Sequence, residues 1–341
     1  MSGIRALARR LELSIGTVSR ALNGRPDVNP ATRDRVLNAA REMGYRPNQS
    51  GRALRHGRTS TVGLVMETGN PSTLGGDSFF MWLVDALQEE LAVAGLDLVI
   101  LPCHSADDPI AFLERQVARR AVDALIISAT RRQDARIAYL AGSDTPFVAL
   151  GRSETPGDYA WIDLDFETVA RESVERLAAL GHRRIAVAVP QGDANLAHLY
   201  LRGYRAAVAA LGLPDDPALV LRTSASENGG VEVAQAILAM DPRPTAVMLG
   251  HEMMAIGLYS TLERAGLRPG ADLSVVGFRQ NPQLGFLSPS LACFRLDLGE
   301  LGRALGRSVV DVLASPAGLK PGRLIWPMGF EPGPSMEPPP L

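Results

Sequence analysis

The sequence predicts a small all-α head followed by a larger α/β body of two lobes with parallel sheets. The chain has 341 residues, too many for one small core, which favours two or three domains. Residues 1–58 hold 12 arginines and 4 acidic residues, whereas the remainder holds 23 basic and 33 acidic residues. From residue 61 onward, short apolar runs alternate with amphipathic stretches, as strands and helices do in α/β proteins.

The head is predicted to be a helix-turn-helix of three short helices. Residues 4–11 place apolar side chains at helical spacing, and Ser14 is a good N-cap for a second helix over residues 15–23. Asn29 caps a third helix, which begins at a proline and covers residues 30–43. Three such helices bury one small core and leave the second helix free to enter a DNA major groove.

The second helix carries most of the residues that we expect to contact DNA. Its apolar face includes Val18, so Ile15, Gly16 and Arg20 face outward. Arg20 can donate two hydrogen bonds to guanine O6 and N7, although a phosphate contact is the alternative. The predicted DNA-binding residues of this region are Ser14, Ile15, Gly16, Thr17, Ser19, Arg20 and Asn23.

Residues 46–58, here called the hinge, are predicted to form a short helix between head and body. A helix this short, with basic ends and Gly51 inside it, is marginal in water by itself. Leu54 is the single large apolar residue among charges, which favours insertion into a DNA minor groove, and an ordinary flexible linker is the alternative. The predicted DNA-binding residues here and just before the hinge are Tyr45, Asn48, Arg52 and Leu54.

The body is predicted to hold parallel strands covered by helices on both faces of each sheet. About ten strand–helix units exceed one sheet, so we expect two similar lobes with a ligand between them at the carboxyl ends of the strands. The candidate strands are residues 61–66, 96–102, 122–128, 146–150, 185–189, 246–249 and 273–277. The candidate helices include residues 79–94, 166–180, 199–211, 231–240 and 253–265.

Several other protein classes lack support in the sequence. There is no run of eighteen apolar residues and no apolar leader, so we expect a cytoplasmic protein without a membrane partner. The two cysteines lie far apart, so neither a metal site nor a disulfide is expected. No Gly-x-Ser-x-Gly elbow, phosphate-binding loop or dinucleotide signature occurs, and the glycine pairs at 75–76 and 229–230 are isolated. We therefore expect no enzyme activity and no cofactor, and the basic head argues against a transport-type binding protein.

The motif SIGTVSRALN at 14–23, VNPATR at 28–33 and GYRPN at 44–48 resemble the head and hinge of the lactose/galactose repressor (LacI/GalR) family. Weaker family-like segments continue through the body, so the resemblance covers almost the whole chain. It implies a homodimer on a pseudo-palindromic operator, with Ile15, Gly16 and Arg20 reading bases and Leu54 inserted at the operator centre. It also implies a periplasmic-binding-protein-like body that binds a small effector, with a sugar as the default.

The resemblance places the effector pocket and shows that its residues depart from the family pattern. Tyr200 stands where the family usually has an arginine, His251-Glu252 replaces Asn-Asp, and Arg279 replaces an acid. An arginine binds carboxylate or phosphate but cannot accept from a sugar hydroxyl, so an acidic effector becomes more plausible, unless Arg279 pairs with Glu252. The predicted ligand-binding residues are Phe79, Phe80, Ser128, Arg152, Tyr200, His251, Glu252 and Arg279. For either phenylalanine, a place in the core is the alternative.

Taken together, the sequence predicts a ligand-responsive repressor of transcription, of the kind that controls carbohydrate metabolism. The expected domains are a DNA-binding head over 1–45, the hinge over 46–58, and an effector-binding and dimerising body over 59–341. Because the pocket residues are altered, a body that only dimerises and binds no ligand stays open as an alternative.

Overall fold

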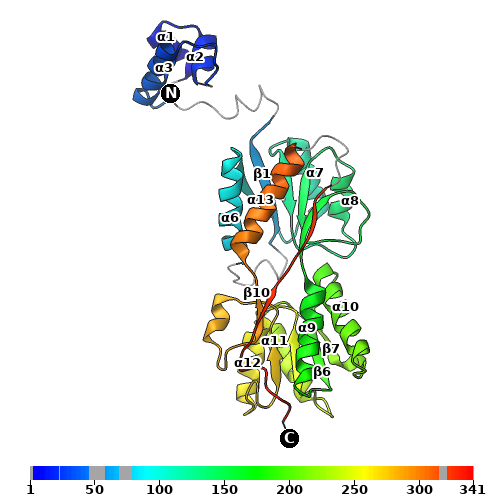
Figure 1. Cartoon of the computed structure of the whole chain (residues 1–341). Helices are drawn as coiled ribbons and strands as arrows, with labels where there is room; N and C mark the ends of the chain where they lie inside the picture. The colour runs from blue at the N-terminus through cyan, green and yellow to red at the C-terminus, as the bar shows by residue number, and fades with distance from the viewer. Residues whose placement is uncertain (1–2, 23, 46–57, 69–78, 315–320, 341) are drawn as a thin grey trace. The chain divides into compact units, whose positions relative to one another are not determined.

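The computed structural model describes residues 3–22, 24–45, 58–68, 79–314 and 321–340. The chain forms two compact units, residues 1–59 and 60–341, and each is described by itself (Figure 1). They correspond to the predicted all-α head and α/β body. Among the described residues, no helix combines the length and the apolar character that crossing a membrane requires.

The head consists of three helices around one apolar core: α1 (Ile4–Leu11), α2 (Ile15–Leu22) and α3 (Pro30–Glu42). Both predicted caps form, because the Ser14 side chain accepts from the backbone N–H of Thr17 at 3.0 Å and the Asn29 side chain accepts from that of Ala31 at 2.9 Å. Gly24 has a φ of +67°, the left-handed conformation that ends α2. The buried core is Leu7, Ala8, Val18, Ala21, Val28, Val36, Ala39 and Ala40.

The first lobe of the body is built on a six-stranded parallel sheet with the order β11-β5-β4-β3-β1-β2. Its strands are β1 (Thr61–Glu67), β2 (Asp97–Cys103), β3 (Ala124–Ile127), β4 (Phe147–Leu150), β5 (Ala160–Leu164) and β11 (Arg323–Trp326). Its helices are α6 (Phe79–Val93), α7 (Pro109–Arg119), α8 (Ala135–Ala141) and α13 (Leu298–Ala314). The strands β3 and β4 are almost wholly buried, as expected for a sheet covered on both faces.

The second lobe has a four-stranded parallel sheet with the order β7-β6-β8-β9. Its strands are β6 (Ile185–Pro190), β7 (Val220–Thr223), β8 (Ala246–Leu249) and β9 (Ser274–Val276). Its helices are α9 (Phe166–Ala179), α10 (Asn195–Ala210), α11 (Glu227–Leu238) and α12 (Met254–Arg264), with short 3-10 turns at Pro217–Leu219 and Pro282–Phe286. Both lobes therefore have the predicted strand–helix alternation.

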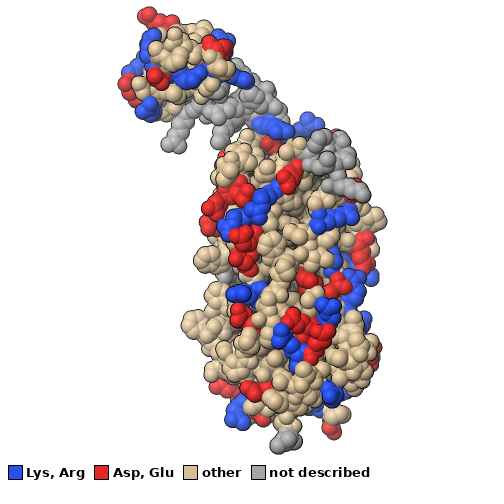
Figure 2. All heavy atoms as spheres, in the orientation of Figure 1, with Lys and Arg blue, Asp and Glu red and all other residues tan. Residues whose placement is uncertain are grey.

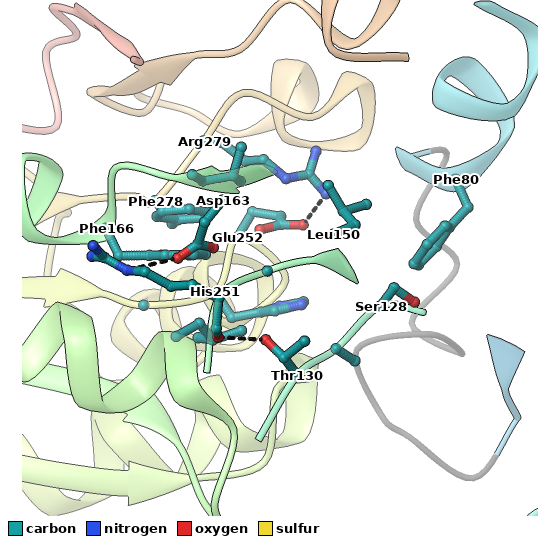
Figure 3. A pocket seen from close by; sticks show the side chains of 16 residues that line it. Phe80, Ser128, Thr130, Leu150, Asp163, Phe166, His251, Glu252, Phe278 and Arg279 are labelled. Carbon is teal, nitrogen blue, oxygen red and sulfur yellow. Dashed lines mark hydrogen bonds and ion pairs between the residues drawn. The ribbon is translucent and has the colours of Figure 1, made fainter. Parts of the chain in front are cut away.

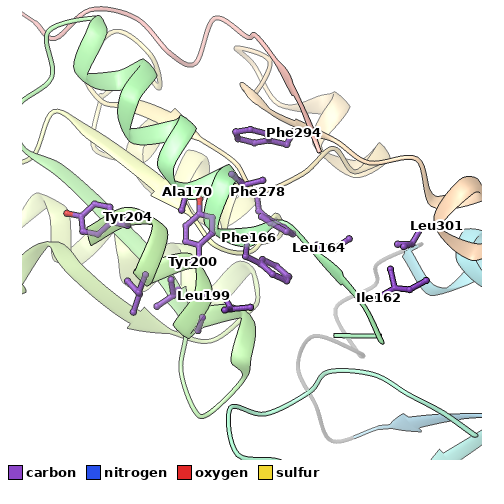
Figure 4. Packing of buried hydrophobic residues seen from close by; sticks show 14 of the residues in the cluster. Ile162, Leu164, Phe166, Ala170, Leu199, Tyr200, Tyr204, Phe278, Phe294 and Leu301 are labelled. Atoms are coloured by element: carbon purple, nitrogen blue, oxygen red, sulfur yellow. The ribbon is translucent and has the colours of Figure 1, made fainter. Parts of the chain in front are cut away.

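The chain passes between the lobes after β5, after β9 and after β11, as Figure 1 shows. A short antiparallel pair, β10 (Cys293–Arg295) with β12 (Gly329–Glu331), lies on two of these passages. One apolar cluster runs through the crossover region from Ile162 in the first lobe to Tyr204 in the second (Figure 4). Because this core is shared, the two lobes are held next to one another at the carboxyl ends of β5 and β9.

Element boundaries are where the sequence predictions were least complete. Strands β5, β7 and β11 were not predicted, and α10 begins at Asn195 rather than at residue 199. The glycines at 229 and 230 lie inside α11, which begins four residues earlier than predicted. A Cβ on Gly230 would overlap the carbonyl oxygen of Met254, so these glycines allow α11 and α12 to approach closely.

Candidate DNA interface and ligand pocket

The outward face of α2 matches the face predicted to contact DNA. Ile15, Gly16 and Arg20 are exposed, while Val18 is fully buried in the head core. An exposed isoleucine, 42% accessible, at the start of a helix is costly in water and suits contact with a thymine methyl group. The first turn of α2 is held in place by Ser14, whose hydroxyl also lies 2.9 Å from the hydroxyl of Thr17.

Arg20 has an ion-pair partner within the head. Its Nε atom lies 3.4 Å from a carboxylate oxygen of Asp27, and both side chains are more than half exposed. Exposed pairs of this kind contribute at most about 1 kcal/mol, so the guanidinium can exchange Asp27 for a nucleic-acid partner at small cost. The pair keeps Arg20 close to the exposed face of α2 before any DNA is bound.

The remaining predicted DNA-binding residues divide into those that the structure describes and those that it does not. Ser19 is half-buried on α2, and Tyr45 packs against the head core, where its backbone N–H donates to Ala40 at 2.8 Å. The predictions for Asn23, Asn48, Arg52 and Leu54 lie outside the described residues.

Basic and acidic groups are both present on the visible face of the body, without a large patch of one sign (Figure 2).

A pocket lies between the lobes of the body, at the carboxyl ends of strands from both sheets (Figure 3). The cavity has a volume of about 130 Å³ and is open to solvent on one side. The first lobe contributes the ends of β3, β4 and β5, and the second lobe contributes the ends of β8 and β9. Six of the predicted ligand-binding residues line it: Phe80, Ser128, Arg152, His251, Glu252 and Arg279.

The apolar part of the pocket comes largely from residues that the sequence did not indicate. Phe166, the first residue of α9, stacks on Phe278 with ring centroids 5.1 Å apart and planes 11° from parallel. Figure 3 shows this pair on the opposite side of the pocket from Phe80, which projects from α6. Leu150, Leu164 and Leu196 complete the apolar lining. Such a surface suits a ring with apolar C–H faces.

The alternative left open for Arg279 is the arrangement found. Its guanidinium forms a buried ion pair with the carboxylate of Glu252, and the two residues are 5% and 1% exposed. His251 lies beside them, and its Nδ1 accepts from the backbone N–H of Met253 at 3.4 Å. Because Glu252 neutralises Arg279, an anionic ligand would have to compete with an existing buried pair.

A second group of paired charges stands on the side of the pocket formed by β4 and β5. Arg152 contacts Asp163 with Nε 3.1 Å from Oδ2, and it also pairs with Glu167 of α9 in the second lobe. Glu167 is bound in turn by Arg202 of α10 at 2.6 Å. Burial is the main cause that raises the pKa of Asp163 to about 7, in spite of the positive charge of Arg152.

The prediction that Tyr200 lines the pocket was wrong. Tyr200 is fully buried in the core, with its ring edge toward Phe278 at a centroid distance of 6.2 Å and its hydroxyl 3.4 Å from the carbonyl oxygen of Leu249 (Figure 4). Burial raises the pKa of its hydroxyl well above the ordinary value. Tyr200 therefore supports Phe278 from behind. The side chain of Phe79 lies outside the described part of the chain.

The loop after β3 is fixed by a buried arginine that the sequence analysis did not single out. Arg136, 1% exposed, donates from Nη2 to Asp134 at 2.6 Å and to the carbonyl oxygen of Ala129 at 3.2 Å, and it also pairs with Glu67. Burial raises the pKa of Asp134, but hydrogen bonds and the charge of Arg136 outweigh it and hold the pKa below the ordinary value. Ala129, with a φ of +50°, and Thr130 in this loop both line the pocket.

No group of three or more histidine, cysteine or acidic side chains suited to a metal ion occurs among the described residues.

The three-helix head with its exposed second helix and the two-lobed, pocket-bearing body together define a DNA-binding transcriptional regulator. Comparison with known proteins gives the same class and identifies the family.

A model of bacterial regulatory proteins of the lacI family matches residues 4–48, and a periplasmic binding protein-like domain matches residues 174–336. The regulator RafR of Escherichia coli is 32% identical over 98% of this chain and 99% of its own. The regulator AglR of Rhizobium meliloti is 36% identical over 80% of this chain and 76% of its own. The chain belongs to the LacI family, whose members matched here are transcriptional regulators and not enzymes.

Solved structures agree with this assignment. A complex of the transcriptional regulator CelR with cellobiose superimposes with a TM-score of 0.73 at 27% identity, covering 98% of this chain and 99% of the other. The lac repressor dimer bound to operator has a TM-score of 0.85 at 23% identity, with the same coverage, and shows the likeness of fold.

Proposed function

We propose that this protein is a homodimeric repressor whose affinity for a pseudo-palindromic operator is set by a neutral, sugar-like molecule in the interlobe pocket. The observation that carries the proposal is the pocket itself, lined by strand ends of both lobes and containing charges that are already paired. The CelR relative was solved with cellobiose, which supports a saccharide as the ligand class. The proposal includes the domains 1–45, 46–58 and 59–341, and a cytoplasmic location.

On the DNA side, Ile15, Gly16 and Arg20 are proposed to read base edges from α2, with Ser14, Thr17 and Ser19 beside them. Their exposure or partial exposure on one helix supports this role. The contributions of Asn23, Tyr45, Asn48, Arg52 and Leu54 stay predictions from the sequence. Arginine contacts to phosphates should make binding fall steeply with salt, because counterions are released.

On the effector side, the paired state of Arg279 removes the reason to favour an acidic ligand. A neutral ring can lie against Phe166, Phe278 and Phe80 and exchange hydrogen bonds with Ser128 and His251 at the rim. A ligand in this position contacts both lobes, so it favours the arrangement of the lobes in which it makes more contacts. The size of the shift is set by the difference between the ligand's affinities for the two arrangements.

The lobes also meet directly beside the pocket. The backbone N–H of Arg132 donates to the carbonyl oxygen of Asp193 at 2.9 Å, and that of Asn195 donates to Thr130 at 2.9 Å. These bonds join the loop after β3 to the start of α10. A ligand that strengthens or breaks them changes the angle between the lobes, and we propose that a dimer transmits this change to its two heads.

Selection of random duplex DNA on the full-length protein at low salt tests the DNA part. We expect a two-fold symmetric site, and we expect Arg20→Ala to lose discrimination at one base pair by about 1–3 kcal/mol. The matched control is Arg41→Ala in α3, an exposed arginine that should change affinity at most uniformly across sequences. Absence of any symmetric site, or a flat response to salt, would contradict the proposal.

Operator affinity measured with and without neutral saccharides tests the effector part. We expect at least one di- or trisaccharide to change it. A protein that binds its operator with unchanged affinity across a broad panel of sugars and sugar acids would instead favour a body that only dimerises.

A further inference from the structure

Asp27 is an acidic residue beside the face of α2 that is expected to meet DNA. Residues 1–58 hold only 4 acidic residues, and a carboxylate close to DNA phosphates weakens binding by repulsion. The cap of α3 does not require it, because the side chain of Asn29 accepts from the backbone N–H of Ala31 at the start of that helix. Neither overall affinity for DNA nor helix capping therefore accounts for a carboxylate at this position.

The loop that carries Asp27 is fixed to the rest of the head. The backbone N–H of Arg25 donates to the carbonyl oxygen of Arg20 at 3.1 Å, and Arg33 donates from Nη2 to the carbonyl oxygen of Arg25 at 2.7 Å. Val28, the residue after Asp27, is 6% exposed in the head core. Asp27 is thus anchored through its backbone next to the end of α2, although its side chain is exposed.

The guanidinium of Arg20 has a neighbour on each side on the outward face of α2. Its Nε lies 3.4 Å from Oδ2 of Asp27, an ion-pair distance. Its Nη1 lies near Gly16, one turn earlier, at a distance of 3.8 Å from the place that a Cβ would take. A side chain longer than that of alanine at position 16 would compete for the space of the guanidinium. Gly16 and Asp27 together therefore favour one direction for Arg20.

The ion pair uses the guanidinium nitrogen that recognition of guanine can leave out. An arginine has five N–H donors in a fixed fork, and its two terminal nitrogens can donate to O6 and N7 of one guanine. The pair is weak enough to exchange, but because Asp27 contacts Nε it can also persist while Nη1 and Nη2 bind a base. A neighbouring carboxylate restricts the rotamers of Arg20 in advance, so less side-chain entropy is lost on binding.

We infer that Asp27 is a positioning residue for base recognition. It orients Arg20 so that both terminal nitrogens bind one guanine in each half of the operator, and it contacts no base itself. This inference rests on the proposed function and adds to it a residue that sets specificity. The negative charge of Asp27 lowers the overall attraction to DNA, while its contact with Arg20 increases the preference for guanine at one base pair. Removing the charge should therefore lower discrimination without lowering affinity for DNA in general.

Fluorescence anisotropy of the full-length protein on its selected operator tests the inference. Arg20→Ala first identifies the base pair that Arg20 reads, as the one at which the preference for guanine is lost. In Asp27→Asn we expect the ratio of dissociation constants at that base pair, adenine over guanine, to fall by about two- to fivefold per half-site, the range of an exposed ion pair. Affinity for random-sequence duplex should stay equal or rise, because a negative charge is removed.

Two controls separate positioning from folding and from charge alone. Glu42→Gln removes another carboxylate of the head, whose ion-pair partner is Arg10, and it should leave the preference at every base pair unchanged. In an Arg20→Ala background, Asp27→Asn should have no further effect on discrimination. A loss of head structure would instead lower affinity for every sequence and would alter the circular dichroism spectrum. If Asp27→Asn does not fold, Asp27→Ser is measured in its place, since serine suits a loop.

The outcomes distinguish this inference from the proposed function. A symmetric operator with an unchanged guanine preference in Asp27→Asn overturns the role of Asp27 and leaves the DNA-binding regulator intact. A changed preference at a different base pair also overturns it, because Asp27 would then read a base directly, as does an effect of Asp27→Asn that persists without Arg20. An operator at which Arg20→Ala removes no guanine preference overturns it too. If no symmetric operator is selected, the proposed function fails and this inference fails with it.

Discussion

Replacing Arg136 with methionine tests how much the buried charges beside the pocket contribute to the stability of the body. In the wild type, Arg136 binds Asp134 through Nη2 at 2.6 Å and through Nε at 3.0 Å, and it also pairs with Glu67. Methionine fills much of the same volume without charge. The variant therefore removes the counter-charge of Asp134 while the loop after β3 keeps its apolar packing.

The expected loss in the free energy of unfolding follows from the carboxylates that remain after Arg136 is removed. Asp134 is 1% exposed and loses its arginine, while Glu67 keeps Arg131, whose Nη2 lies 2.8 Å away. Removing one partner of a buried pair costs about 3–5 kcal/mol, and because Glu67 stays paired we expect the free energy of unfolding to fall by about 3 kcal/mol at pH 8. Arg115→Met is the control, since its pair with Asp107 is about half exposed and worth at most about 1 kcal/mol.

The pH dependence separates the loss of a charge partner from a simple packing defect. In the wild type the pKa of Asp134 is low, so its contribution to stability is present at neutral pH and is lost only as the pH falls through that low value. Without Arg136, burial raises the pKa of Asp134, and protonation relieves part of the penalty at pH 5. Urea unfolding followed by circular dichroism at pH 5 and pH 8 measures this. A loss below about 1 kcal/mol, or one equal at both pH values, would refute the reasoning.

Two further predictions concern the body. Raising the pH from 5 to 8 should lower the free energy of unfolding of the wild type by about 2–3 kcal/mol more than that of Asp163→Asn. The reason is that Asp163 has a pKa of about 7 in the folded wild type, so the folded protein holds a proton that the unfolded chain has lost. Equal pH slopes of the two proteins in urea titrations would contradict this. Gly230→Ala should destabilise the protein in a thermal-unfolding assay by about 1–3 kcal/mol or more, because the new Cβ overlaps the backbone of Met254. The control is Gly322→Ala, which has open space around it and should leave the stability nearly unchanged in the same assay.

Local signals were sufficient to predict most of the head. The boundaries of α2 depend on Ser14, whose hydroxyl accepts from the backbone N–H three residues later, and on Gly24, whose left-handed φ ends the helix. The exposed positions of α2 follow from helical periodicity once Val18 is placed in the core. Contacts of this kind involve residues close in sequence, so the sequence alone specifies them.

The error at Tyr200 shows that a resemblance to a family does not determine which way a side chain points in this chain. Gly203 packs so closely on α9 that a Cβ would overlap the carbonyl oxygen of Glu167. Tyr200 precedes Gly203 by three residues and so lies on the same helix face, and it is buried together with Gly203 and Tyr204. The glycine in Leu-Arg-Gly-Tyr was therefore a signal that this face of α10 is in the core. A correct placement of α10 from residue 195 would have turned Tyr200 away from the pocket.

The chemistry of the pocket could be predicted only as a set of residue types, because pairing decides what each charge can do. Arg279 alone favours an acidic ligand, but Glu252, 27 positions earlier, neutralises it across two strand ends. Asp163 was missed because β5 was missed, although an acid within the apolar run Ala-Trp-Ile-Asp-Leu was a signal, since a buried parallel strand has no structural need for a carboxylate. With Arg279 paired to Glu252 and Asp163 beside Arg152, each charge in the pocket has a partner of opposite sign. The charge of any one residue type in the sequence therefore does not decide between a neutral and an acidic ligand, because that preference depends on contacts between residues far apart in the chain.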